Sequence, residues 1–360
     1  MARLSVDELR VLRRVLKDVC AERREYYFEP PAFLTRLLVE LLKDPRDRPI
    51  LFLFFNIIVL TLPGAALVFL AESHVIGFCF WLANVVFFQE RFIVGLHYHS
   101  HRGLFKSDRL NAAVAGLLSP FFGMPSGLYC LHHIVMHHVE NNRAGWDLSS
   151  TEEYQRDNLL HFLVYWARFV CLVWFELPLY ALRRGRFGFA IGSLLVVICF
   201  WAIARVMCSL NPCAAFWLYL FPTFVNSLLL MWGNWCQHIF VDPANPRSNY
   251  HLAYNVINDS CNQRAFNDGY HIEHHANSRK HWSELPSSFL ENIGRYAKED
   301  AIVFEGLDPM KVGFLVFGGR YDILAQHLVQ LRKPPRSVVE VEAFLRSRLV
   351  PVGDTPRVHK

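Results

Sequence analysis

The run from Leu51 to Ala71 contains no charged residue, and it is long enough for a helix to cross a hydrocarbon core of about 30 Å. Lys43, Arg46 and Arg48 precede it, so the positive-inside rule predicts a cytosolic N-terminus. Backbone polar groups in lipid must bond within their own segment, which favours helices as spans. The sequence therefore predicts an all-α integral membrane protein, in agreement with its 53% content of hydrophobic residues.

Five further apolar segments follow, and they differ in how readily each would cross a membrane. The segment 110–131 is broken by proline and glycine, which indicates a re-entrant or surface-packed piece. The segment 159–182 carries Arg168 and Glu176, and we expect it to lie in the membrane interface. Four spanning helices remain, at about residues 51–71, 75–96, 187–208 and 214–237. The predicted organisation is a cytosolic amphipathic segment at 1–49, a membrane domain at 50–290 and a cytosolic tail at 291–360.

Three clusters hold most of the 17 histidines. They are His97 and His101; His132, His133, His137 and His138; and His271, His274 and His275. Side chains three or four residues apart lie on one face of a helix. In the second cluster this rule pairs His133 with His137, while His138 points about 100° away from His137. All three clusters fall on the predicted cytosolic side, and neutral imidazole is a preferred ligand of transition metals.

Other kinds of histidine-rich site fit these clusters less well. A zinc protease would need His-Glu-x-x-His, an order that His271-Ile-Glu-His does not have. A structural zinc site uses about four ligands and a haem uses one or two, but at least eight imidazoles are available here. Two metal ions with about four to six ligands each would use that number. The sequence therefore predicts a di-metal site on a cytosolic cap; a non-catalytic, metal-binding membrane protein is the alternative.

The three clusters, in this order, resemble the histidine boxes of the membrane-bound fatty acid desaturase superfamily. A further match is Asn234-Trp-Cys-Gln-His238, which resembles the Asn-x-x-x-His of acyl-CoA desaturases. The resemblance implies two iron ions, O2 as co-substrate and a new C=C double bond in a lipid acyl chain; lipid hydroxylation is the alternative reaction. It implies Asn234 as a ligand through water. It also implies nine imidazole ligands, namely His97, His101, His133, His137, His138, His238, His271, His274 and His275.

Side chains near the boxes are candidates to support these ligands. A ligand imidazole usually donates its other N–H to a carboxylate or carbonyl. The carboxylates close enough in sequence are Glu140, Asp147, Asp268 and Glu273. His132 competes with His133 as the first ligand of the second box, and we expect His99 to support a ligand or to be exposed.

The sequence also bears on partners and location. It lacks the His-Pro-Gly-Gly motif of a fused cytochrome b5 domain, so we expect a separate electron donor of the cytochrome b5 or ferredoxin type. Basic residues near the boxes, such as Arg102, Arg264 and Arg279, are candidates to receive an acidic partner. The net charge of +5 comes from cations that border apolar runs, which argues against nucleic-acid binding. We expect residence in the endoplasmic reticulum, with the boxes on the cytosolic face.

Overall fold

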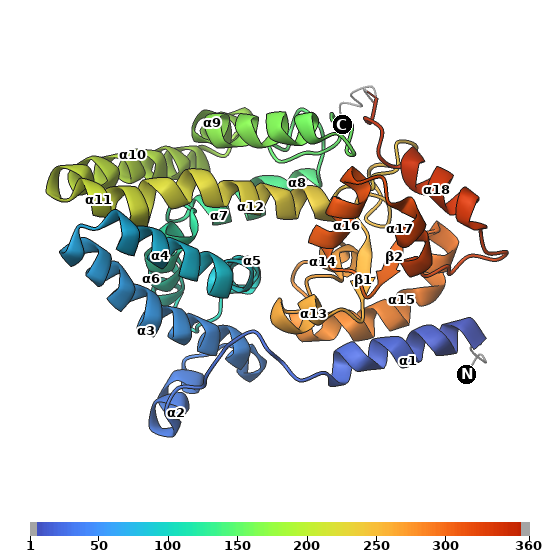
Figure 1. Ribbon diagram of the computed structural model, residues 1–360, viewed down its shortest axis with the longest axis horizontal. Coiled ribbons are helices and arrows are strands. Elements are labelled where there is room, and N and C mark those ends of the chain that lie inside the picture. The colour runs from blue at the N-terminus through green and yellow to red at the C-terminus, as the bar shows by residue number, and fades with distance from the viewer. Residues whose placement is uncertain (1–5, 354–360) are drawn as a thin grey trace.

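The computed structural model describes residues 6–353, so both extreme ends of the predicted terminal segments lie outside the described residues. Helices dominate the fold (Figure 1). The first half contains α1 (Val6–Cys20), α2 (Ala32–Glu40), η1 (Pro45–Asp47), α3 (Arg48–Ala71), α4 (His74–Asn84), η2 (Val85–Gln89), α5 (Glu90–Arg102), α6 (Asp108–Leu118), η3 (Ser119–Phe122), α7 (Leu128–His132), η4 (His133–His137) and α8 (His138–Glu140). The second half contains α9 (Leu159–Arg183), α10 (Phe187–Leu210), α11 (Pro212–Ala215), η5 (Phe216–Leu220), α12 (Phe221–Gln237), β1 (Asn255–Ile257), α13 (Ser260–Arg264), α14 (His271–Ala276), η6 (Trp282–Glu284), α15 (Leu285–Glu299), β2 (Val303–Glu305), α16 (Pro309–Phe317), α17 (Tyr321–His327) and α18 (Val338–Ser347).

The long apolar helices gather on one side of the molecule. Figure 1 shows α3, α4, α10 and α12 there, and α13–α18 with both strands on the other side. The last turns of α5 and α12 both point toward this second part, which brings the first histidine cluster and His238 to the same end of the bundle. Five helical stretches are long and apolar enough to cross a membrane, namely Pro45–Ala71, His74–Arg102, Leu159–Arg183, Phe187–Leu210 and Pro212–Gln237.

These five stretches are one more than the four predicted spans, and the additional one is α9. Near its start, the hydroxyl of Tyr165 donates to the carbonyl of Ser149 at 3.2 Å. Near its end, the hydroxyl of Tyr180 donates to the carboxylate of Glu140 at 2.6 Å. Both tyrosines contact the segment that follows the second histidine cluster, and α9 packs along α10 and α12. The count of four spans stays a prediction.

The segment from 108 to 132 forms the short helices α6, η3 and α7 and no span, as the prolines and glycines predict. The chain turns at Gly123, whose φ is 82°. A Cβ at this position would lie 2.3 Å from the carbonyl oxygen of Pro222 in α12. Only glycine tolerates both the left-handed backbone and this approach. The turn thus fixes the segment that precedes the second histidine cluster against α12.

The structure corrects the all-α prediction at one place, a two-stranded parallel sheet. Asn255 of β1 lies opposite Val303 of β2, and Ile257 lies opposite Glu305. Strands of three residues are too short to leave a recognisable period in a sequence. The strand β2 lies in the predicted C-terminal tail, and α16 of the same region packs against α12. The tail is therefore joined to the part of the chain that carries the histidines.

The N-terminal helix α1 places its apolar stripe against protein. Val11 and Val15 are buried, and α1 packs along α15. The carboxylate of Asp18 accepts a hydrogen bond of 2.6 Å from the hydroxyl of Tyr270, the residue before α14. The helix therefore covers the base of the third histidine cluster.

Arg156 ties the C-terminal end of the chain to the end of α12. Its guanidinium is buried and donates to the carbonyl of Ile239 at 2.9 Å and to that of Arg348 at 2.9 Å. It also donates to the carbonyl of Val350 at 2.6 Å. Next to it, the hydroxyl of Thr151 donates to the carbonyl of His238 at 2.8 Å. The position of His238 thus depends on segments from three parts of the sequence.

Candidate metal centre

The nine predicted histidine ligands converge at the end of the helix bundle, in two neighbouring groups. The larger group has one ligand atom of each ring within 4.8 Å of all the others and contains His97, His101, His133, His138 and His274. The Nε2 atom of His274 lies 2.8 Å from that of His97 and 3.0 Å from that of His138. On the other side, the Nε2 atom of His133 lies 3.0 Å from that of His138.

The smaller group contains His137, His238 and His275, which meet the same 4.8 Å criterion. His271 adjoins it. The Nε2 atom of His271 lies 3.3 Å from that of His238 and 3.2 Å from that of His275. The third cluster is therefore divided, with His274 in the larger group and its neighbours His271 and His275 in or beside the smaller one.

The second cluster is divided differently from the α-helical prediction. That prediction pairs His133 with His137, but in the structure His133 meets His138, and His137 belongs to the smaller group. The reason is local geometry, because His133–His137 form the π-helical turn η4. A π-turn replaces the i to i+4 pairing of an α-helix by i to i+5, and such turns occur frequently at functional sites. The widened turn aims adjacent histidines at different groups.

Hydrogen bonds to Nδ1 fix the proton position in two of the rings. The Nδ1 atom of His238 lies 2.9 Å from the carbonyl oxygen of Leu252. A carbonyl only accepts, so Nδ1 carries the proton and Nε2 keeps its lone pair. The Nδ1 atom of His137 donates in the same way to the carboxylate of Asp147 at 2.7 Å. Burial raises the pKa of Asp147, but His137, His132 and Ser149 together outweigh burial and hold the pKa of this carboxyl below its ordinary value.

The donor set suits transition-metal ions. Burial lowers the pKa of His133, His271, His274 and His275 well below the usual value, so these rings are neutral. A neutral imidazole has one N–H, yet the Nε2 atom of His274 faces two other Nε2 atoms. Lone pairs therefore converge on common points, and two ions with imidazole ligands would satisfy them.

The family model for fatty acid desaturases matches residues 71–304. The chain belongs to the fatty acid desaturase family. All nine histidines and Asn234 lie inside the match, whereas α1–α3 and α16–α18 lie almost entirely outside it. No match was found among curated proteins, and none among solved structures.

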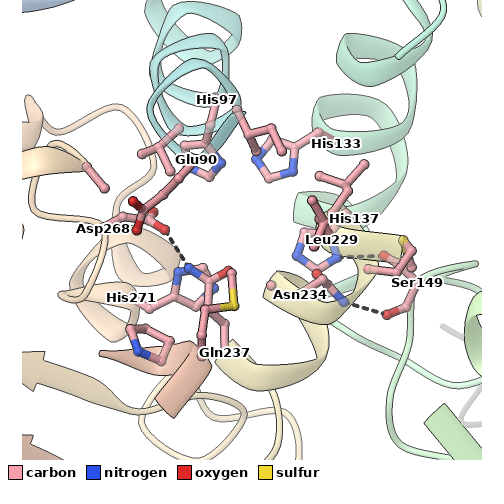
Figure 2. Close-up of a pocket in the computed structure, with 18 of the residues that line it drawn as sticks. Glu90, His97, His133, His137, Ser149, Leu229, Asn234, Gln237, Asp268 and His271 are labelled. Atoms are coloured by element: carbon pink, nitrogen blue, oxygen red, sulfur yellow. Dashed lines mark hydrogen bonds between the residues drawn. The ribbon is translucent and has the colours of Figure 1, made fainter. Parts of the chain in front are cut away.

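In this desaturase-family chain, Asn234 lies beside the smaller histidine group. Its side-chain nitrogen donates to the carbonyl of Ser149 at 3.0 Å and to the hydroxyl of Tyr165 at 2.7 Å. These two bonds hold the amide in one orientation. Asn234 and His137 line the same cavity, as Figure 2 shows, so the amide oxygen is available to a water between them.

Three of the four candidate carboxylates have other partners. Glu140 accepts from Tyr180 and pairs with Arg184 at 2.5 Å. Asp268 accepts from Gln237 at 2.5 Å, and burial raises the pKa of Asp268 to about 7. Glu273 accepts from the hydroxyl of Tyr296 at 2.9 Å and from Ser288. Of the four, only Asp147 accepts a hydrogen bond from a predicted ligand among the described residues. Tertiary packing decides which carboxylate meets a ligand, and distance along the sequence does not.

The two uncertain histidines lie outside both groups. His99 is buried and bonds to the carbonyl of Asn111 at 3.1 Å, so the expectation that it is exposed is wrong. The Nε2 atom of His132 lies 4.0 Å from Asp147 and has no hydrogen-bond partner among residues 6–353. Burial lowers the pKa of His132 to about 4.

A cavity of about 130 Å³ adjoins the histidine groups. Its apolar wall includes Val94, Phe169, Leu229 and Met231. Figure 2 shows His97, His133 and His137 around it, with His271 on the opposite side from His133. A smaller, apolar cavity between α7, α9 and α12 shares several lining residues with it, among them Tyr129, His132 and Phe169. The histidine groups are thus adjacent to space suited to an aliphatic chain.

Proposed function

We propose that the protein is a membrane di-iron oxidoreductase that uses O2 and two electrons to introduce a C=C double bond into a lipid acyl chain. The observation that supports this most strongly is the convergence of nine imidazoles from distant parts of the chain into two adjacent groups. Membership of the fatty acid desaturase family agrees with it. Iron would supply the oxidising power that no side chain has for removing hydrogen from an unactivated CH2 group.

The proposed ligand sets follow the two groups. One ion would be held by His97, His101, His133, His138 and His274. The other would be held by His137, His238, His271 and His275, with Asn234 bonding through water. The hydrogen bond to Asp147 orients the His137 ring and makes it a stronger ligand.

The cavity residues bind and position the substrate in this proposal. Val94, Phe169 and Leu229 give the acyl chain an apolar surface beside the histidines. The apolar cavity at Leu128 and Trp174 extends this surface between the bundle helices. Binding the acyl chain in a fixed position beside the metal ligands orients the reacting carbons, which lowers the entropic part of the reaction barrier.

We further propose a separate electron donor of the cytochrome b5 or ferredoxin type, and residence in the endoplasmic reticulum with the histidines facing the cytosol. Two candidate docking cations are engaged elsewhere. Arg102 pairs with Asp44 at 3.3 Å, and Arg264 pairs with Glu90 at 3.7 Å. Arg279 is exposed, and its guanidinium has no partner among the described residues, which makes it the better candidate for an acidic donor.

Lipid profiling of a host with and without the intact protein tests the reaction. Desaturation lowers the mass of a product by about 2 Da, whereas hydroxylation raises it by about 16 Da. Metal analysis of the purified protein should give about two irons per chain. His271→Ala should lower this content, and His74→Ala should not, because His74 bonds to Trp217 far from both groups. One zinc per chain, without O2 consumption or a changed lipid, contradicts the proposal.

A further inference from the structure

The cavity beside the histidines opens at the surface of the helix bundle. Among its described lining residues, only Glu90 and Leu229 are exposed, and Figure 2 shows them on opposite sides of the cavity. Glu90 begins α5, about 10 Å before His97 along the helix, and Leu229 lies in α12, about 14 Å before His238. Both helices belong to stretches that are apolar enough to cross a membrane, with the histidine near the C-terminal end. The opening is therefore on the membrane side of the histidine groups.

The helix surface around this opening is apolar. Val86 and Phe87, in the turn that precedes Glu90, are both exposed. In α12, Phe224 is exposed in the turns that precede Leu229. Exposed apolar side chains on helices of spanning length are typical of a surface that faces lipid. The opening thus lies next to the surface that acyl chains would contact.

The third side of the opening comes from α16, which lies outside the family match. Met310 of this helix lines the cavity, and a Cβ at Gly233 of α12 would lie 3.4 Å from its methyl carbon. One turn further along, Phe314 packs on Trp232 of α12 with ring centroids 5.0 Å apart, and it is still 65% exposed. Lys311 is exposed on the same helix. The helix α16 therefore continues the apolar surface of α12 and has a cation beside it.

A second contact extends this surface to α9. Phe317 of α16 packs on Trp232 at 5.1 Å between ring centroids, and its ring lies 6.4 Å from that of Phe162 in α9. Leu159 and Leu163, at the same end of α9, are exposed. The exposed residues of α16 thus adjoin two helices of spanning length. An apolar surface that is continuous with such helices and bordered by a lysine fits the interface of a bilayer.

We infer that α16 lies in the membrane interface with Phe314 among the acyl chains, and that the lipid substrate enters the cavity from the bilayer, between α5, α12 and α16. This inference rests on the proposed function, because it takes the cavity as the acyl-binding site. The substrate class is then a lipid that resides in the bilayer. The polar side of the opening, where Glu90 pairs with Arg264 at 3.7 Å, would lie at the level of the head groups. The inference also revises the predicted organisation, since α16 falls within the tail predicted to be cytosolic.

Photo-cross-linking in phosphatidylcholine nanodiscs tests the position of α16 without turnover. In the iron-loaded full chain, p-benzoylphenylalanine replaces Phe314. The same photoreactive residue replaces Ile191 of α10, which is 61% exposed, as the positive control. It replaces Val339 of α18, which is 77% exposed, as the matched control outside the proposed surface. Lipid adducts should form at position 314 at a level close to that at 191, and not at 339. A level at 314 no higher than that at 339 overturns the inference.

Two substitutions test entry through the opening. Leu229→Trp narrows the opening from α12, and Phe314→Glu places a charge on the face proposed to contact acyl chains. Each should slow the formation of the altered lipid in the host and leave the iron content unchanged, because neither residue is a proposed ligand. Val339→Glu is the control and should change neither quantity. Formation of the altered lipid at the full rate in both Leu229→Trp and Phe314→Glu contradicts entry at this place.

Failure of this inference and failure of the proposed function give different results. Protein that contains iron and alters host lipids, but forms no lipid adduct at position 314, retains the proposed function and refutes the inference. Loss of iron or of the altered lipid in the intact protein counts against the proposed function instead.

Discussion

The Nδ1 atom of His137 lies 2.7 Å from a carboxylate oxygen of Asp147, and this is the single direct carboxylate contact to a proposed ligand among residues 6–353. Ser149 donates a second hydrogen bond, of 2.7 Å, to the other carboxylate oxygen. The pair therefore has a fixed geometry in a buried setting. His137 lines the cavity beside the histidine groups, and Asp147 lines a separate, polar cavity that also includes Arg143 and Trp146.

Asp147→Asn should weaken metal binding by about 10- to 100-fold, because the amide removes the charge that strengthens and orients the His137 ligand. Titration of the purified metal-free protein with Fe²⁺ measures the change. Glu153→Gln is the control, since Glu153 is an exposed carboxylate on the same loop. An unchanged affinity in Asp147→Asn shows that the hydrogen bond does not support a ligand.

Adjacent histidines in the second box should differ in their effect on metal content. His133→Ala removes a member of the larger group and should lower the iron content and abolish the reaction. His132→Ala should keep the iron content, because His132 lies outside both groups. Metal analysis of both variants from the same preparation distinguishes them. Equal losses contradict the assignment of His133 as the ligand.

Acid should destabilise the metal-free protein, in part through His132. Burial lowers the pKa of His132 from 6.5 to about 4, so the unfolded chain binds its proton first. Above about pH 6.5 the ring is neutral in both states and the free energy of unfolding is unaffected. As the pH falls from 6.5 toward 4, protonation of His132 in the unfolded chain lowers the free energy of unfolding by up to about 3 kcal/mol. Thermal unfolding of the metal-free protein between these pH values measures it. The loss should be smaller in His132→Phe, and an equal loss in both proteins contradicts the prediction.

Gly123→Ala should destabilise the protein strongly. The left-handed backbone alone costs about 1–2 kcal/mol for a residue with a Cβ, and the new methyl group would overlap the carbonyl of Pro222. A lower thermal midpoint and poor recovery in detergent are the expected results. Gly188→Ala is the matched control, because a Cβ at Gly188 in α10 meets nothing within 4 Å. Similar stability of the two variants means that the turn can shift away from α12.

The sequence was sufficient to predict the long apolar helices and the convergence of the histidines, because uncharged runs and helical spacing are local properties. The division of the second cluster was not predictable in this way. It depends on the π-turn at His133–His137, whose five residues have no distinctive composition. The same holds for Asp147, which sequence alone ranks equally with Glu140 and Glu273. Their partners, Arg184 and Tyr296, come from helices remote in the chain.

The division of α14 between both histidine groups has a consequence for how the protein is made. His274 completes one group and His275 the other, so a growing chain that ends before α14 contains neither complete group. The carbonyl of Val350, which accepts a hydrogen bond from Arg156, lies still further along the chain than α14. Because domains assemble as their residues leave the ribosome, the two histidine groups can become complete only after α14 has been made, and by then all the long apolar helices that precede it have been made.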